Sequence, residues 1–342
     1  MTPYAILEER ARAVLPRPVF DYYAGGAGDE DTLAANARAW SAVRLRPRVL
    51  RDVSRVDTST TVLGARIAAP VLVAPTAFHR LAHPSGELAT AEGTAAAGSL
   101  LVLSTRSSTR IESVAAAAGP WWFQVYLLRD RGLTKEFVQR ATAAGARALV
   151  LTGDTPYVGR KRRDRGSLAI PDEDFRANLE RLTDVALAEQ AANVTFDDIG
   201  WLHELSRLPV LVKGVLRGDD AARCLEAGAA GVVVSNHGGR QLDGAVATAE
   251  ALPEVVEAIA GRGEVLVDGG VRSGRDVVRA LALGARAVLL GRSVLWGLAT
   301  EGAAGVQRVL TEVQEDTAHV MALAGASSVD EVTSDLVTLG AV

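Results

Sequence analysis

The chain of 342 residues contains a single cysteine, Cys224, and therefore cannot form a disulfide within itself. This is typical of a cytoplasmic protein, and we expect Cys224 to be a small buried apolar residue. Charged residues from Glu8 onward interrupt the N-terminal segment and exclude a secretory signal peptide. No apolar run approaches the roughly 18–20 residues that span a bilayer, so no membrane partner is expected.

The chain also lacks an excess of positive charge. Lysine and arginine number 37 against 41 aspartate and glutamate residues, for a formal net charge of −4. This balance excludes a general nucleic-acid binder, which needs a basic field. One local exception is the basic run at 160–165, with the sequence RKRRDR. It is either a solvated loop or a loop that meets an anionic cofactor or substrate.

Short, almost continuously apolar runs recur along the sequence, as expected for parallel strands buried on both faces. They are Val71–Ala74, Leu100–Leu103, Trp122–Tyr126, Ala148–Thr152, Val210–Lys213, Gly231–Ser235, Val265–Asp268 and Ala287–Leu290. Alanine-rich stretches of helical length lie between them, and several end in a glycine that favours helix termination, namely Gly98, Gly145, Gly228 and Gly284. This order predicts an α/β fold, a (β/α)8 TIM barrel in which residues 1–342 form one domain.

Two regions depart from the repeated strand and helix. Residues 1–68 are predicted to form an N-terminal extension with helices at Pro3–Val14, Val19–Ala24 and Glu30–Trp40. A hairpin of Thr60–Leu63 and Arg66–Ala68, turned at Gly64-Ala65, would complete it. The second region is the long connection after the fourth strand, residues 156–195, which we expect to act as a lid.

Catalytic groups of a barrel lie where its strands end. The seventh predicted strand runs into Asp268-Gly269-Gly270-Val271-Arg272, and the eighth into Gly291-Arg292. Glycines let the backbone approach an anion, and the two arginines add donors suited to phosphate oxygens. The loops after the last two strands are therefore predicted to bind a phosphate group.

Two further strand ends carry candidate catalytic side chains. Lys213 ends an apolar strand, where it could form a Schiff base, stabilise a developing anion or make a structural ion pair. His237 lies in a glycine-rich turn after the sixth strand and is the natural general base. Asp154, after the fourth strand, could orient His237 and stabilise its protonated form.

These segments resemble the FMN-dependent 2-hydroxy acid oxidase and dehydrogenase family, which includes glycolate oxidase, lactate oxidase, mandelate dehydrogenase and hydroxymandelate oxidase. The resemblance runs from about Tyr4 to Leu323 and is most specific in the string SNHGGRQLD at 235–243. Other matching strings are DYYAGGA at 21–27, APTA at 74–77, HPSGE at 83–87, QVY at 124–126, DTP at 154–156, LVKG at 211–214 and DGGVR at 268–272.

The resemblance implies a role for each matching position. FMN would be held by Ala74, Pro75, Thr76, Ala77, Ser104, Gln124, Thr152, Lys213 and Ser235, with its phosphate near Asp268, Gly270, Arg272, Gly291 and Arg292. The catalytic residues would be His237, Asp154, Lys213, Tyr126 and Arg240, and the substrate would contact Tyr22, Arg106, Tyr126, Lys161, His237 and Arg240. No metal is expected.

The reaction implied is oxidation of a small 2-hydroxy acid to a 2-oxo acid, with His237 as base and Arg240 binding the carboxylate. Oxygen or another acceptor would reoxidise the flavin, and the resemblance implies a homotetramer. A peptide or larger natural product oxidised on the same barrel is the alternative. A Schiff-base aldolase would also use a barrel, a phosphate site and a lysine, but it leaves His237-Gly238-Gly239-Arg240 unexplained.

Three features depart from the family pattern. Arg106 replaces an aromatic residue of glycolate oxidase-like members, Lys161 replaces a frequent arginine, and the connection after the fourth strand is short. A second arginine in a partly dry pocket needs a partner. Arg106 could pair with an acidic residue of that connection (Asp172, Glu173 or Asp174), bind a second polar or anionic group of the substrate, or turn into solvent.

Overall fold

A computed structural model describes residues 2–163, 168–179 and 184–339 of the chain. Its centre is a closed barrel of eight parallel strands in which β11 pairs with β4 to complete the ring. The strands are β4 (Val71–Val73), β5 (Leu100–Leu103), β6 (Trp121–Val125), β7 (Leu149–Thr152), β8 (Val210–Val215), β9 (Gly231–Val234), β10 (Glu264–Val267) and β11 (Ala287–Leu290). The predicted (β/α)8 barrel is confirmed.

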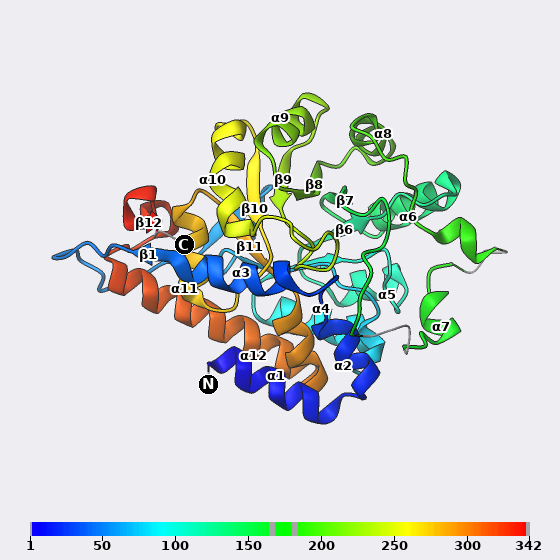
Figure 1. Cartoon of the computed structure of the whole chain (residues 1–342), viewed down its shortest axis with the longest axis horizontal. Helices are drawn as coiled ribbons and strands as arrows, with labels where there is room; N and C mark the ends of the chain where they lie inside the picture. Colours follow the sequence, from blue (N-terminus) through cyan, green and yellow to red (C-terminus); the bar gives the residue numbers. More distant parts are fainter. Residues whose placement is uncertain (1, 164–167, 180–183, 340–342) are drawn as a thin grey trace.

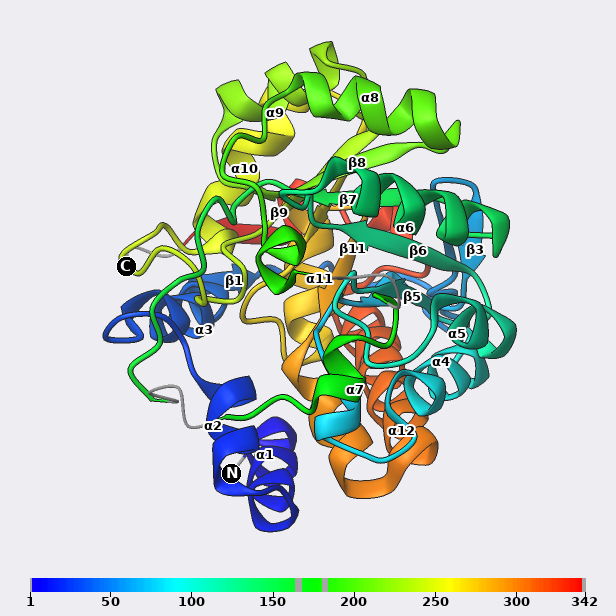
Figure 2. The ribbon, with the colours of Figure 1, turned by 90° about the vertical axis from the view of Figure 1, so that its right-hand side faces the viewer.

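Helices surround this barrel, as Figures 1 and 2 show. They are α4 (Gly86–Ala96), α5 (Ile111–Ala117), α6 (Arg131–Ala143), α8 (Asp197–Ser206), α9 (Gly218–Glu226), α10 (Thr248–Ile259), α11 (Gly274–Ala282) and α12 (Arg292–Ala324). Helix α12 is kinked at Glu301 and Gly302, where the backbone leaves the helical region. All four glycines predicted to end helices have positive φ.

The N-terminal extension contains α1 (Pro3–Val14), α2 (Arg17–Ala24) and α3 (Asp31–Ala42). Helix α1 packs against α12 (Figure 1). Helix α2 begins two residues earlier than predicted, because Pro18 is tolerated in a first helical turn. The short strand β1 (Val43–Leu45) was not predicted; it pairs antiparallel with β12 (Val337–Leu339) at the other end of the chain.

A hairpin of β2 (Thr60–Val62) and β3 (Ala65–Ile67) packs under the barrel. Its turn is Leu63-Gly64 and not the predicted Gly64-Ala65, since both residues have positive φ, as a two-residue hairpin turn of this kind requires. Val62, Ala65 and Ile67 are buried in one apolar cluster with residues inside the barrel. The Leu63 amide donates to Glu264 Oε1 at 2.9 Å, at the start of β10, so the hairpin fills the N-terminal end.

The 156–195 connection contains the short helix α7 (Asp172–Phe175) and a 3-10 turn at Val185–Ala188. Asp164 and Arg165 of the basic run lie outside the described residues. Arg162 and Arg163 of that run form ion pairs with Asp29 and Glu30, so these two arginines contact the N-terminal extension. In the part of the chain that the structure describes, no helix is long and apolar enough to cross a membrane.

Candidate active site

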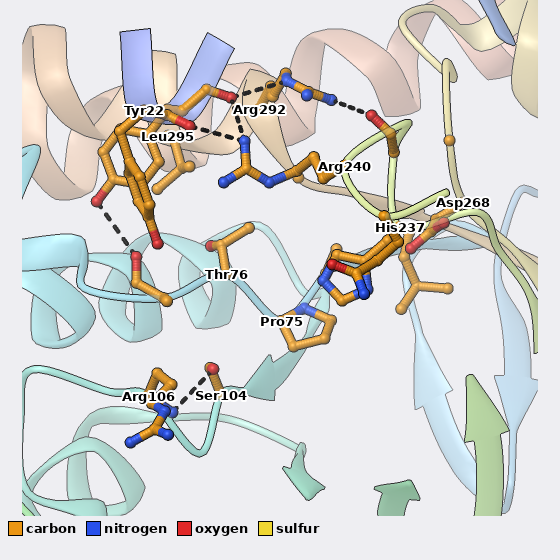
Figure 3. A pocket seen from close by; sticks show the side chains of 18 of the residues that line it. Tyr22, Pro75, Thr76, Ser104, Arg106, His237, Arg240, Asp268, Arg292 and Leu295 are labelled. Atoms are coloured by element: carbon orange, nitrogen blue, oxygen red, sulfur yellow. Dashed lines mark hydrogen bonds between the residues drawn. The ribbon is translucent and has the colours of Figure 1, made fainter. Parts of the chain in front are cut away.

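A cavity of about 530 Å³ lies at the C-terminal ends of the barrel strands (Figure 3). This volume is in the range of small-molecule and cofactor sites. The predicted residues that line it are Tyr22, Ala74, Pro75, Thr76, Ala77, Ser104, Arg106, Tyr126, Lys161, Lys213, His237, Arg240, Asp268, Gly270, Arg272, Gly291 and Arg292. One cavity therefore brings together most of the predicted site residues.

The remaining predicted residues lie behind the cavity wall and hold those in front. The Gln124 amide nitrogen donates to Thr152 Oγ1 at 2.9 Å, and its oxygen accepts from Ser104 Oγ at 3.2 Å. Ser235 Oγ accepts a hydrogen bond of 2.8 Å from Lys213 Nζ. Gln124, Thr152 and Ser235 are all buried, so they fix the positions of Ser104 and Lys213.

Lys213 forms a buried ion pair with Asp268, at 3.1 Å between Nζ and Oδ2. A Schiff-base lysine must be a neutral amine, and a carboxylate contact disfavours that form. The other oxygen of Asp268, Oδ1, is buried and has no hydrogen-bond partner. Both residues line the cavity, so the pair presents a cation and an unfilled acceptor to whatever occupies it.

His237 and Asp154 form the contact expected of a base and its partner, at 3.0 Å between Nδ1 and Oδ1. Because a carboxylate only accepts, Nδ1 carries the proton and Nε2 keeps its lone pair. Burial acts to raise the pKa of Asp154, but the charges of His237 and Lys213 and the hydrogen bond from His237 hold it below its ordinary value. His237 lines the cavity, and Asp154 supports it from behind.

The backbone makes room for this pair in two places. His237 has φ of 59°, a left-handed conformation followed by Gly238 and Gly239 at positive φ, and its amide donates to Ser235 Oγ at 3.0 Å. Gly214, in the irregular end of β8, has φ of 106°, and a Cβ there would lie 2.5 Å from Asp154. A side chain at Gly214 would displace the partner of the base.

Arg240 is held by one nitrogen only. Its Nη1 donates to the carbonyl oxygens of Tyr22 at 2.7 Å and Gly25 at 2.8 Å, and its guanidinium lies 5.2 Å from the centre of the Tyr22 ring. Its Nε and Nη2 make no hydrogen bond to the residues described. This leaves the Nε–Nη2 edge, which suits bidentate binding of a carboxylate.

The two arginines of the predicted phosphate site differ. Arg292 donates to the carbonyl oxygens of Tyr23, Gly238 and Gly25, and its burial, with the neighbouring charge of Arg240, lowers its pKa to about 10. Arg272 is exposed, and its guanidinium lies 4.2 Å from the centre of the Tyr4 ring. Arg292 thus fixes the loops around the cavity, while Arg272 has more freedom to meet an anion.

The SNHGGRQLD turn is bound to the N-terminal extension. The side-chain amides of Asn36 and Asn236 exchange hydrogen bonds of 2.9 and 2.8 Å. Asp243 accepts from the backbone amides of Asp29 and Thr32 at 2.8 and 2.9 Å, at the start of α3. Sequence reasoning missed Asn36 and Tyr4; an asparagine inside a predicted helix was the available signal for the first.

Arg106 lies in the wall of the cavity and is held there by residues of the 156–195 connection. It lines the cavity, donates from Nη2 to the Ala188 carbonyl oxygen and lies 5.3 Å from the centre of the Phe175 ring. The predicted pairing with an acid of the connection is wrong, because Asp172 pairs with Arg176, and Asp174 and Glu173 pair with Arg80. Burial lowers the pKa of Arg106.

Two tyrosines and Lys161 also line the cavity. Burial, followed by the charge of Asp154, raises the pKa of Tyr126, so its phenol stays protonated and can donate. The Tyr22 ring packs edge-on against that of Tyr23, 5.1 Å between centres. Lys161 also lines the cavity, with its Nζ 3.4 Å from the Gly159 carbonyl oxygen.

A family model described as FMN-dependent dehydrogenase matches residues 11–339. The chain belongs to this family. An L-lactate oxidase from Nostoc sp. is 47% identical over 352 residues, which cover 97% of this chain and 96% of that protein. The 2-hydroxyacid oxidase 1 of Homo sapiens is 44% identical over 350 residues, covering 96% and 94%.

Solved structures of relatives share the whole fold. A crystal structure of mandelate oxidase with (S)-2-phenylpropionate superposes with a TM-score of 0.93 at 45% identity, covering 99% of both chains. A mandelate oxidase variant described with an FMN adduct has the same TM-score and covers 98% of this chain. This FMN-dependent oxidoreductase therefore shares the fold of these structural neighbours over 98–99% of its chain.

The residues of the cavity fit FMN. The unpaired Asp268 Oδ1 is buried where a hydroxyl donor of a sugar-alcohol chain would satisfy it. Gly291 precedes the first turn of the long helix α12, whose N-terminal amides favour an anion such as the phosphate. No group of three or more potential metal-binding side chains is found among the residues described.

Proposed function

We propose that this enzyme oxidises a 2-hydroxy acid to a 2-oxo acid, with His237 as the base and Arg240 as the carboxylate-binding group. The proposal rests on one observation: His237 and Arg240 line the same cavity, and each has available the atoms that its role requires. His237 has its Nε2 lone pair available, and Arg240 has its Nε–Nη2 edge available. The reaction removes two electrons and two protons, and FMN supplies the two-electron acceptor when bound.

Each protein group has a defined part. Arg240 binds the carboxylate and so orients the 2-carbon toward the base. His237 takes a proton at Nε2, from either the 2-carbon or the 2-hydroxyl group, and Asp154 stabilises the imidazolium that results. Tyr126 and Tyr22 donate hydrogen bonds to the substrate, and Lys161 adds a positive charge to the cavity lining.

The cofactor contacts form two groups. The segment Ala74–Ala77, with Ser104, Gln124, Thr152 and the Lys213–Ser235 pair, would hold the ring system, and Lys213 would stabilise negative charge on it. Gly270, Arg272, Gly291 and Arg292 would bind the phosphate. Asp268 fits a hydroxyl group better than the phosphate, because its carboxylate would repel another anion.

The electron acceptor, the oligomeric state and the cellular compartment are proposed as well. We propose dioxygen as the acceptor because relatives are named oxidases, a homotetramer by family resemblance, and a cytoplasmic location from the single buried Cys224. A rice relative, 45% identical, is named peroxisomal, which makes fractionation of cells the direct check of the last point. The 156–195 connection is proposed to cover the bound substrate.

The test is anaerobic bleaching of the flavin absorbance by a panel of 2-hydroxy acids, followed by admission of air and assay of peroxide. His237→Ala should lower the rate of bleaching on the order of 10²–10⁴-fold and leave FMN bound. His203→Ala is the matched control, because His203 is exposed, does not line the cavity, and its ring nitrogen forms a hydrogen bond with the Leu208 carbonyl oxygen. Near-normal bleaching by His237→Ala would overturn the assignment of the base.

A further inference from the structure

We propose that Arg106 selects substrates with a second anionic group, so that the preferred 2-hydroxy acids are dicarboxylates. The inference rests on the proposed function, in which Arg240 binds the carboxylate next to the 2-hydroxyl carbon. The substrate would then extend from Arg240 to Arg106, its distal carboxylate meeting the second guanidinium. Arg106 lies on another side of the cavity from Arg240 in the view of Figure 3, with Thr76 and Pro75 between them.

The hydrogen bonds of Arg106 leave most of its donors available. One nitrogen, Nη2, donates to the carbonyl oxygen of Ala188, and Nε and Nη1 have no hydrogen-bond acceptor among the residues described. The guanidinium lies over the Phe175 ring at 5.3 Å, which covers one face and leaves the in-plane N–H groups for a ligand. A planar carboxylate is the natural acceptor for two such groups.

The protein compensates the charge of Arg106 only from a distance, through Glu189. No carboxylate of the described residues lies within ion-pair distance of it, since Asp172, Glu173 and Asp174 turn to other arginines. Glu189 is the nearest acid in the cavity lining, and it forms an ion pair of 2.8 Å with Arg129 near the surface. A partly buried guanidinium without a directly paired anion is unfavourable, so an anionic group of a ligand in the cavity would be stabilised by Arg106.

The experiment compares 2-hydroxy acids of equal chain length with and without the distal carboxylate. The pairs are 2-hydroxysuccinate against 2-hydroxybutyrate and 2-hydroxyglutarate against 2-hydroxypentanoate, each measured as kcat/KM for flavin reduction in the FMN-loaded enzyme. We expect the dicarboxylate to be preferred by roughly 10–100-fold, the range of a charge-assisted hydrogen bond. Arg106→Gln, which removes the charge and keeps a polar side chain, should reduce this ratio to near one, mainly through KM.

Arg80→Gln is the matched control. Arg80, like Arg106, contacts helix α7: its guanidinium lies 3.1 Å from Asp174. Unlike Arg106, it does not line the cavity. We expect Arg80→Gln to leave the dicarboxylate preference unchanged. Succinate and butyrate, which lack the 2-hydroxyl group, give a readout without turnover: perturbation of the flavin spectrum should show tighter binding of succinate, and Arg106→Gln should abolish the difference.

The outcomes separate this inference from the proposed function. If monocarboxylates bleach the flavin as well as dicarboxylates do, the role of Arg106 is wrong and the proposed function stands. If Arg106→Gln lowers kcat/KM of all substrates equally, Arg106 only links the β5 loop to the 156–195 connection. If no 2-hydroxy acid bleaches the flavin, the proposed function fails, and equal binding of succinate and butyrate would then refute the inference as well.

Discussion

Asp154→Asn tests how much of the rate depends on the charge behind the base. The substitution keeps the size of the side chain and leaves an oxygen that can accept from His237 Nδ1, so it removes mainly the negative charge. In the wild type this charge is maintained at neutral pH, because the histidine and lysine nearby hold the pKa of Asp154 below its ordinary value. The imidazolium formed during catalysis would lose its counter-ion in the variant.

The size of the expected loss in rate can be worked out from the distance between His237 Nδ1 and Asp154 Oδ1. At 3.0 Å, a full ion pair in an effective dielectric of about 20 is worth roughly 5.5 kcal/mol. The side chains of His237 and Asp154 are 22% and 13% exposed, so solvent screens part of this, and we take about half, ~2.7 kcal/mol. Each 1.36 kcal/mol is tenfold in rate, which predicts a loss of roughly 100-fold.

The assay is stopped-flow bleaching of the flavin under anaerobic conditions at saturating substrate. FMN content should not change, because Asp154 does not line the cavity. Asp197→Asn, at an exposed position in the first turn of α8, is the control and should retain the wild-type rate. A loss below about threefold in Asp154→Asn would refute the view that this carboxylate stabilises the protonated base.

Three further predictions concern stability and reactivity. Hydrogen bonds from Arg140 lower the pKa of Glu112 from 4.5 to about 2, so this contact stabilises the fold above pH 4.5 and is lost as pH falls toward 2. Since the Glu112 side chain is 44% exposed, Glu112→Gln should cost under about 1 kcal/mol in urea unfolding at pH 7, and progressively less as the pH falls through 2. Burial raises the pKa of the Cys224 thiol to about 12, so a thiol reagent should label it only after unfolding. Gly270 has φ of 84°, and a Cβ there would lie 2.9 Å from Asn36, so Gly270→Ala should lower the melting temperature and weaken FMN binding measured by fluorescence. Unchanged melting and FMN affinity would contradict the close packing of this loop.

The barrel could be predicted because its strands are buried on both faces and therefore read as apolar runs. The same reasoning failed where an element has very few residues or depends on an unusual backbone conformation. Strands β1 and β12 have three residues each and come from opposite ends of the chain, so no local pattern links them. The hairpin turn was shifted by one residue because Leu63 adopts a positive φ that leucine rarely takes.

In the candidate site, too, some residues could be predicted from the sequence and others could not. Residues at strand ends, such as His237 and Lys213, could be found because the barrel places all such ends on one face. The partners of Arg106 could not, since Phe175 and Ala188 belong to an irregular connection whose path no periodicity fixes. Tyr4, which lies under Arg272, comes from a helix far away in the sequence, and only the packing of the extension on the barrel brings it there.

The hairpin under the barrel has a consequence for the order of events in turnover. Because Val62, Ala65 and Ile67 fill the N-terminal end, the barrel offers no through-passage, and substrate, product and oxidant share the open side. The 2-oxo acid product must therefore leave, and the electron acceptor must enter, through the same opening of the cavity. Turnover at high product concentration should slow at reoxidation before it slows at substrate oxidation, and a bulkier product should slow it more.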